Sequence, residues 1–166
     1  HAIPWEYSIP EDDWTYVAPQ VTRILGYSPE EWTDYAFWLD RLHPEDRGWA
    51  ADYCEACSAR GESHVFEYRF RAKSGDYLWL RDVVSVEMAE GKPVRIRGFM
   101  IDITDRKHSE DELARLAEEK AVLLRELTHR VKNNLQVLYG LLRFQIESAE
   151  ERRVSEALGL ARLRLQ

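Results

Sequence analysis

The chain has 166 residues, of which 45% are hydrophobic and 11% aromatic, a composition that supports one ordinary globular core. Charged residues make up 32% of the sequence, a high share that indicates exposed helix in addition to a compact domain. The formal net charge of -7 disfavours binding to nucleic acid or to anionic membranes, because both require a basic surface. With no apolar run of about 18 residues and no signal peptide, we expect a cytoplasmic protein without membrane contact.

Residues 4–104 carry the alternating pattern of β-strands. Five strands are predicted, at residues 5–9, 15–19, 64–72, 77–89 and 94–103. In the third, Phe66, Tyr68 and Phe70 alternate with charged residues, so one face is apolar and the other charged. Short segments with turn-forming residues separate the last three strands, which should therefore form an antiparallel meander.

Helical signals lie between the second and third predicted strands. Residues 28–31, Ser-Pro-Glu-Glu, combine an N-cap serine, a first-turn proline and an N3 glutamate, which predicts a helix start. Residues 48–61 predict a second helix that ends at Gly61. A five-stranded antiparallel sheet with helices inserted after the second strand is an α+β fold.

The two cysteines, Cys54 and Cys57, form a C-x-x-C pair in the second of these helices. A structural zinc site needs four ligands, and no second pair or H-x-x-H run supplies them. The middle of a helix is also not the strand-to-helix turn at which the pKa of a thiol is lowered. We therefore expect both side chains to pack in the core, without metal or redox chemistry.

The order of these elements, with the strings ILGYSPEEW, LHPEDR, FEYRF, GDYLWL and DITDRK, resembles a PAS domain over nearly all of residues 4–107. The resemblance implies a sensor domain. It also implies that Asp102, Ile103 and Thr104 form the motif through which many PAS domains pass from the last strand into a signalling helix. On physical grounds, the Thr104 hydroxyl is suited to capping that helix.

Cofactor-binding members of the family carry characteristic residues. Flavin-binding members carry a reactive Cys in an N-C-R-F-L-Q string, which is absent, and haem-binding members use a His on the helix before the third strand, where residues 48–61 have none. His43 is expected to support a loop and His64 to begin a strand. We expect no flavin, haem or metal, and either a small apolar ligand or a packed core.

From residue 105 onward the sequence has no Pro and only two Gly, and it reads as helix. The a and d positions of a two-stranded coiled coil are occupied by Leu113, Leu116, Lys120, Leu123 and Leu127. A seam that cannot be buried within one chain implies a partner helix, and the simplest partner is a second copy in parallel. Packing of this helix on the sheet of its own chain is the alternative.

Beyond Leu127 the heptad spacing breaks, and residues 148–151 offer a capping box before apolar residues resume at helical spacing. We expect a helical hairpin whose second helix is truncated at Gln166, and two copies would form a dimeric four-helix bundle. The predicted domains are a sensor domain at 4–104, a coiled-coil linker at 105–127 and dimerisation and phosphotransfer helices at 128–166.

His129 lies midway between Leu127 and Val131, so a helix of 100° per residue turns its imidazole outward. Glu126 and Asn133 lie within about 60° of it on the same face. A nucleophilic imidazole must be neutral, accessible and held in one tautomer, and Glu126 could accept the proton of the other ring nitrogen. On these residues alone, an idle surface histidine remains the alternative.

Residues 123–142, LLRELTHRVKNNLQVLYGLL, are similar to the phosphoacceptor helix of sensor histidine kinases, in the subgroup with the signature H-R-x-K-N-N-L. The resemblance implies that His129 is phosphorylated and that Glu126 and Asn133 orient it. The commonest histidine kinases have an acidic residue directly after the histidine, where this chain has Arg130. Glu126 as the proton acceptor is therefore a hypothesis.

Phosphoryl transfer from ATP requires groups that bind the phosphates and Mg²⁺, and the sequence has neither a P-loop nor a Gly-rich or Asn-containing segment after the predicted bundle helices. The family places an ATP-binding domain downstream, so we expect a fragment that can be phosphorylated but needs that domain, with ATP and Mg²⁺, to phosphorylate itself. The expected partners are a second copy and the receiver domain of a response regulator. A non-catalytic dimeric scaffold and a small-ligand-binding module are the alternative functions.

Overall fold

The computed structural model describes residues 2–163, with the side chains of residues 2–146 and 148. The chain divides into two units, His1–Glu110 and Asp111–Gln166. The first unit contains a β-sheet with short helices, and the second is helical.

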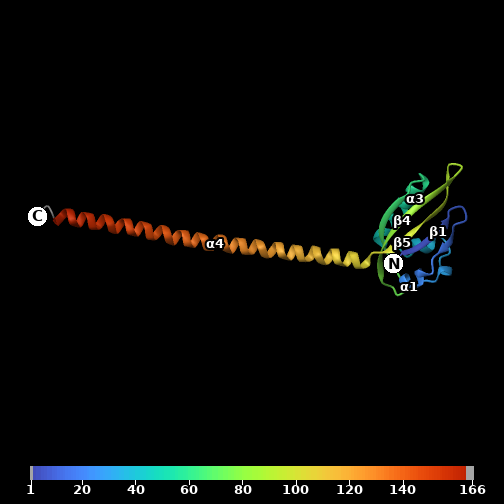
Figure 1. Cartoon of the computed structure of the whole chain (residues 1–166), viewed down its shortest axis with the longest axis horizontal. Helices are drawn as coiled ribbons and strands as arrows, with labels where there is room; N and C mark the ends of the chain where they lie inside the picture. Colours follow the sequence, from blue (N-terminus) through green and yellow to red (C-terminus); the bar gives the residue numbers. More distant parts are fainter. Residues whose placement is uncertain (1, 164–166) are drawn as a thin grey trace. The chain divides into compact units, whose positions relative to one another are not determined.

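The first unit is built on a five-stranded antiparallel sheet, as the sequence predicts. Its strands are β1 (Ala2–Ser8), β2 (Asp13–Val17), β3 (His64–Arg71), β4 (Tyr77–Ala89) and β5 (Lys92–Asp102). Their order in the sheet is β2-β1-β5-β4-β3 (Figure 1). The first strand along the chain, β1, therefore pairs with the last, β5. Glu90 and Gly91 both have positive φ, 51° and 77°, in the turn between β4 and β5. Such a turn matches the right-handed twist of a β-hairpin.

Four short helical elements connect β2 to β3: α1 (Gln20–Leu25), the 3₁₀ turn η1 (Pro29–Glu31), α2 (Tyr35–Leu39) and α3 (Pro44–Ala59). The predicted capping box at Ser28 is present, but only the 3₁₀ turn follows it. Trp32 leaves helical geometry there and its ring stacks on Phe70, with centroids 5.6 Å apart. Burial of this indole therefore ends the helix that local sequence signals favour.

Helix α3 begins four residues before the predicted start, because Pro44 occupies the first helical position and the His43 imidazole accepts a hydrogen bond from the Glu45 backbone N–H. Cys54 and Cys57 are both free and buried on this helix, as expected for packing residues. The aromatic side chains of β3, Phe66, Tyr68 and Phe70, line the same core.

The helix α4 (Thr104–Leu163) is continuous through residues 148–151, where the sequence predicts the turn of a hairpin. A hairpin turn would interrupt the backbone hydrogen bonds of the helix, and the packing of its two helices would have to offset that loss. A single chain lacks the partner helices of a bundle, so the uninterrupted helix, which keeps these bonds, is favoured. None of the helices formed by residues 2–163 combines the length and apolar character needed to cross a bilayer.

Candidate functional site

The imidazole of His129 lies exposed on α4, as the helical spacing predicts. Asn133 is one turn further along, and its Nδ2 atom is 3.3 Å from Nδ1 of His129. A partner on Nδ1 selects the ring tautomer and leaves Nε2 accessible. The predicted proximity of the two side chains is confirmed, and the role of Asn133 in orienting the ring stays a prediction.

The carboxylate of Glu126 bonds to a different residue, with its Oε1 atom 2.5 Å from Nη2 of Arg130. Both side chains are exposed, so this pair adds little to the stability of the helix. Proton acceptance by Glu126 stays a prediction, and it requires that the pair with Arg130 opens.

A surface hollow beside the imidazole is lined by Ala121, Leu124, Arg125, Thr128, His129 and Lys132. Arg125 and Lys132 place positive charge next to His129, and charge-assisted hydrogen bonds from such groups suit a phosphoryl group. The Thr128 hydroxyl donates instead to the backbone oxygen of Leu124, at 2.8 Å. This face of α4 therefore carries the His129 imidazole between two cationic side chains.

The segment that joins β5 to α4 is bound directly to strand β4. Asp102 Oδ1 accepts hydrogen bonds from the backbone N–H and the hydroxyl of Thr104, at 3.0 and 2.6 Å. The Thr104 oxygen accepts the backbone N–H of Trp79 at 3.0 Å, and the Ile103 N–H donates to the Trp79 carbonyl at 2.9 Å. Thr104 is thus the first helical residue and not the capping residue that the sequence suggests, because its hydroxyl is used by β4.

The predicted coiled-coil seam is a row of exposed leucines. Leu113, Leu116, Leu123 and Leu127 are 67%, 47%, 60% and 58% exposed. Lys120 is the one polar member of this row, and apolar side chains along one face of a helix need a partner surface to be buried. The seam is therefore available for association.

Asp82 lies fully inside the first unit and accepts hydrogen bonds from two aromatic residues. Its Oδ1 atom accepts the indole N–H of Trp5 and its Oδ2 atom the hydroxyl of Tyr68, both at 3.0 Å. The Tyr68 oxygen in turn accepts the indole N–H of Trp38 at 3.0 Å. Burial without a cation raises the pKa of the Asp82 carboxyl to about 7. Sequence reasoning missed this group, although its position on the apolar face of β4 was a signal.

The interior beside Asp82 has almost no free space. The cavity there measures about 20 Å³ and is bounded by aromatic rings, Cys54 and Val84. That volume holds about one water molecule, which is far less than a flavin or a haem ring occupies. Burial also raises the pKa of the Cys54 thiol to about 12, which disfavours thiolate chemistry.

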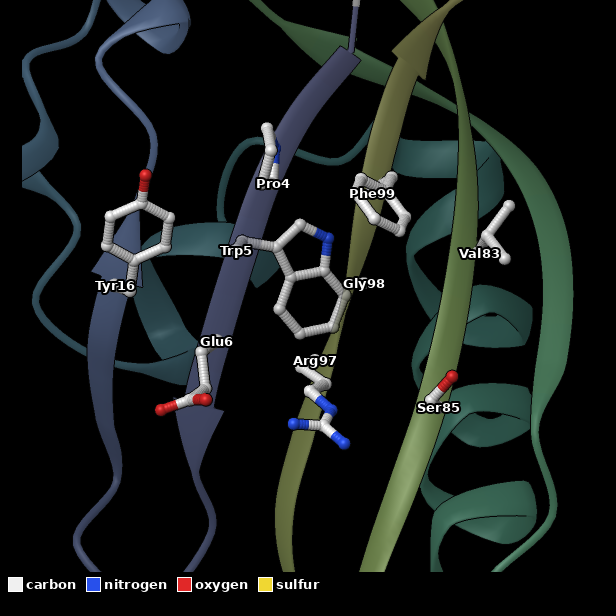
Figure 2. A pocket seen from close by; sticks show the side chains of 9 residues that line it. All are labelled: Pro4, Trp5, Glu6, Tyr16, Val83, Ser85, Arg97, Gly98 and Phe99. Carbon is white, nitrogen blue, oxygen red and sulfur yellow. The ribbon is translucent and has the colours of Figure 1, made fainter.

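Two larger hollows open to the surface of the first unit. One, of about 340 Å³, lies between α3, β1 and β5 and includes Tyr7, Tyr35 and Ser58. The other, also about 340 Å³, lies on the sheet face opposite α3, between Tyr16 and Phe99 (Figure 2). In the part of the chain that the structure describes, no group of three or more His, Cys, Asp or Glu could hold a metal ion.

Two family models match the chain. A PAS fold model matches residues 15–100, and a histidine kinase model matches residues 126–166. The blue-light-activated histidine kinase of Brucella anthropi is 28% identical over 142 residues, which cover 86% of this chain and 27% of that protein. The protein of the same name from Brucella ovis is 26% identical with the same coverage. The chain thus spans 27% of the length of these curated relatives.

Solved structures resemble the first unit. The N-terminal domain of a diguanylate cyclase with a PAS/PAC sensor from Marinobacter aquaeolei is 35% identical, with a TM-score of 0.63, over 65% of this chain and 100% of that one. A sensory box histidine kinase/response regulator from Burkholderia thailandensis is 30% identical, with a TM-score of 0.61, over 71% of this chain and 88% of that one. The chain therefore belongs to the PAS fold family, and its PAS domain is followed by a histidine kinase segment.

Proposed function

We propose that the full protein is a sensor histidine kinase in which the PAS domain controls phosphorylation of His129 by ATP, followed by transfer to an Asp of a response regulator. The observation that carries the proposal is the exposed imidazole of His129 with Asn133 at Nδ1, inside the segment that matches the histidine kinase model. A downstream ATP-binding domain would supply ATP and its Mg²⁺.

We infer that Nε2 of His129 is the nucleophile. The amide nitrogen Nδ2 of Asn133 faces Nδ1 and can only donate, so this orientation leaves the ring proton on Nε2. The mechanism therefore requires that the amide turns its oxygen to the ring, or that Glu126 takes its place, to accept a hydrogen bond from Nδ1–H and leave the Nε2 lone pair free. Nε2 then attacks the γ-phosphorus of ATP, the bond from phosphorus to the β–γ bridging oxygen breaks, and ADP leaves. Arg125 and Lys132 lie where they would neutralise the transferred group. In the second step the phosphorus–nitrogen bond breaks as an Asp carboxylate of the receiver domain attacks.

We also propose that the active form is a cytoplasmic homodimer. Leu113, Leu116, Leu123 and Leu127 would pair as a coiled coil. Residues 128–166 of two copies would form a four-helix bundle, which requires that α4, continuous in the single chain, turns near residues 148–151 on association. Support comes from the exposure of this row and of further apolar residues beyond it, such as Val131, at 55%.

For the PAS domain we propose sensing without a flavin or haem, through a small ligand or through the fold itself. The named activity of the Brucella relatives makes light a signal to test, but the cavity of about 20 Å³ beside Asp82 argues against a ring cofactor there. Purified protein with the visible absorption of oxidised flavin would refute this part of the proposal.

The central test is labelling from radioactive ATP in the protein that includes the ATP-binding domain. The wild type should acquire acid-labile, base-stable label, and His129→Gln should acquire none. His108→Gln, which changes another exposed histidine of the same helix, is the matched control and should keep its label. Equal labelling of the wild type and His129→Gln would refute the assignment.

A further inference from the structure

Three charged residues connect the sheet to the first turns of the signalling helix. Glu67 on β3 places Oε1 2.7 Å from Nη2 of Arg106 and Oε2 2.7 Å from Nζ of Lys107. We call Glu67, Arg106 and Lys107 the junction cluster. All three belong to the first unit, whose last residue is Glu110.

The cluster is partly shielded from water. The side chains of Glu67 and Lys107 are 28% and 25% exposed, and the Lys107 ammonium lies 5.0 Å from the centre of the Trp79 ring. The hydrogen bond from Lys107 holds the pKa of the Glu67 carboxyl below its usual value. Two strands therefore hold the start of α4, β3 through a carboxylate and β4 through Trp79.

The helix also carries a second acceptor for the same two cations. Glu110 Oε1 is 2.7 Å from Nη1 of Arg106, and its Oε2 is 3.9 Å from Nζ of Lys107. If the start of α4 leaves the sheet, both cations keep this partner on their own helix, at spacings that favour ion pairs. The free energies of the bound and released positions of the helix therefore differ by less than they would if release left both cations without a partner. A small difference of this kind is what a switch between two states requires.

We propose that Glu67 is a positioning residue that holds the first turns of α4 against the sheet, and that opening of the junction cluster changes the phosphorylation of His129. The second part rests on the proposed kinase function, and the first part does not. Two measurements separate them.

The first measurement is the rate at which Lys107 is acetylated by N-hydroxysuccinimidyl acetate in the full chain, followed by peptide mass spectrometry. In Glu67→Gln the rate should rise by about twofold to fivefold, the upper part of the range expected when a partly exposed ion pair is lost. Glu110→Gln removes the same chemical group one turn along the helix but keeps the pair with Glu67, so its rate should stay near that of the wild type. Unchanged reactivity in Glu67→Gln would overturn the proposal.

The second measurement is the rate of His129 labelling in the protein with its ATP-binding domain. Glu67→Lys should change this rate by about threefold or more, and Arg106→Glu with Lys107→Glu in the same chain should bring it back toward the wild-type value. Glu11→Lys, a charge reversal in an exposed turn, is the control and should have no effect. A residue that only stabilises the fold would give no such rescue.

The two measurements decide the two parts of the proposal separately. If acetylation of Lys107 is faster in Glu67→Gln but labelling of His129 is unchanged in Glu67→Lys, the signalling role is overturned. A wild type that folds and binds ATP but is never labelled would refute the kinase function, and Lys107 acetylation would still decide whether Glu67 holds the helix.

Discussion

The titration of Asp82 should make the PAS domain less stable as the pH rises toward neutrality. The carboxyl is fully buried and its pKa in the folded protein is about 7, against 3.8 for the ordinary group. A folded protein with the higher pKa binds more protons, so stability is greatest below the unfolded pKa and falls until the pH passes the folded pKa.

The size of the effect follows from the distance between the two pKa values. A full shift from 3.8 to about 7 corresponds to about 4 kcal/mol, and the part that falls between pH 5 and pH 8 is about 3 kcal/mol. Urea unfolding followed by tryptophan fluorescence at these two pH values measures it directly.

The substitution Asp82→Asn removes the titration and keeps the volume of the side chain. Its amide oxygen can still accept from Trp5, but its NH₂ group meets the hydroxyl of Tyr68, so about 1 kcal/mol is lost at low pH. The variant should be about as stable as the wild type at pH 5, where the wild type has already lost about 1.7 kcal/mol, and about 3 kcal/mol more stable at pH 8. Parallel dependences on pH in the two proteins would refute the assignment of Asp82.

Three further changes test other parts of the account. Leu123→Asp should weaken self-association by about tenfold or more in analytical ultracentrifugation, whereas Val122→Asp, outside the seam, should not; equal effects would contradict the coiled coil. Thr104→Val leaves the Trp79 amide of β4 without its acceptor and should lower the free energy of unfolding by about 1–3 kcal/mol in urea titrations. An unchanged free energy of unfolding would show that this hydrogen bond does not stabilise the junction. Asn133→Ala should slow labelling of His129 about tenfold to hundredfold at saturating ATP, while an unchanged rate would leave Asn133 without a role.

The strands could be predicted because their signal is local. Each buries one face, so apolar residues recur at every second position, as Phe66, Tyr68 and Phe70 do. Helices α1 and α2, of six and five residues, are too short for a 3.6-residue period to be visible. The helix start at Ser28 was predicted from sound local chemistry, but Trp32 ends it through a contact with Phe70, which is distant in the sequence.

In the candidate site, too, local features could be predicted from the sequence and contacts between distant elements could not. The exposure of His129 and its proximity to Asn133 follow from helical spacing alone, and both are present. The pair between Glu67 and Lys107 could not be predicted, because it depends on where α4 leaves the sheet and which position of β3 it passes. The partner of Glu126 was missed, although Arg130 is also one turn away and its guanidinium carries a permanent positive charge.

The most direct test of the account locates the phosphoryl group itself. Protein with its ATP-binding domain is incubated with ATP and Mg²⁺, digested at neutral to basic pH, and sequenced by mass spectrometry with a gentle fragmentation method. We expect one phosphorylated residue in the stretch 123–142, His129. A phosphoryl group on any other residue, or an unmodified stretch in a protein that binds ATP, would contradict it.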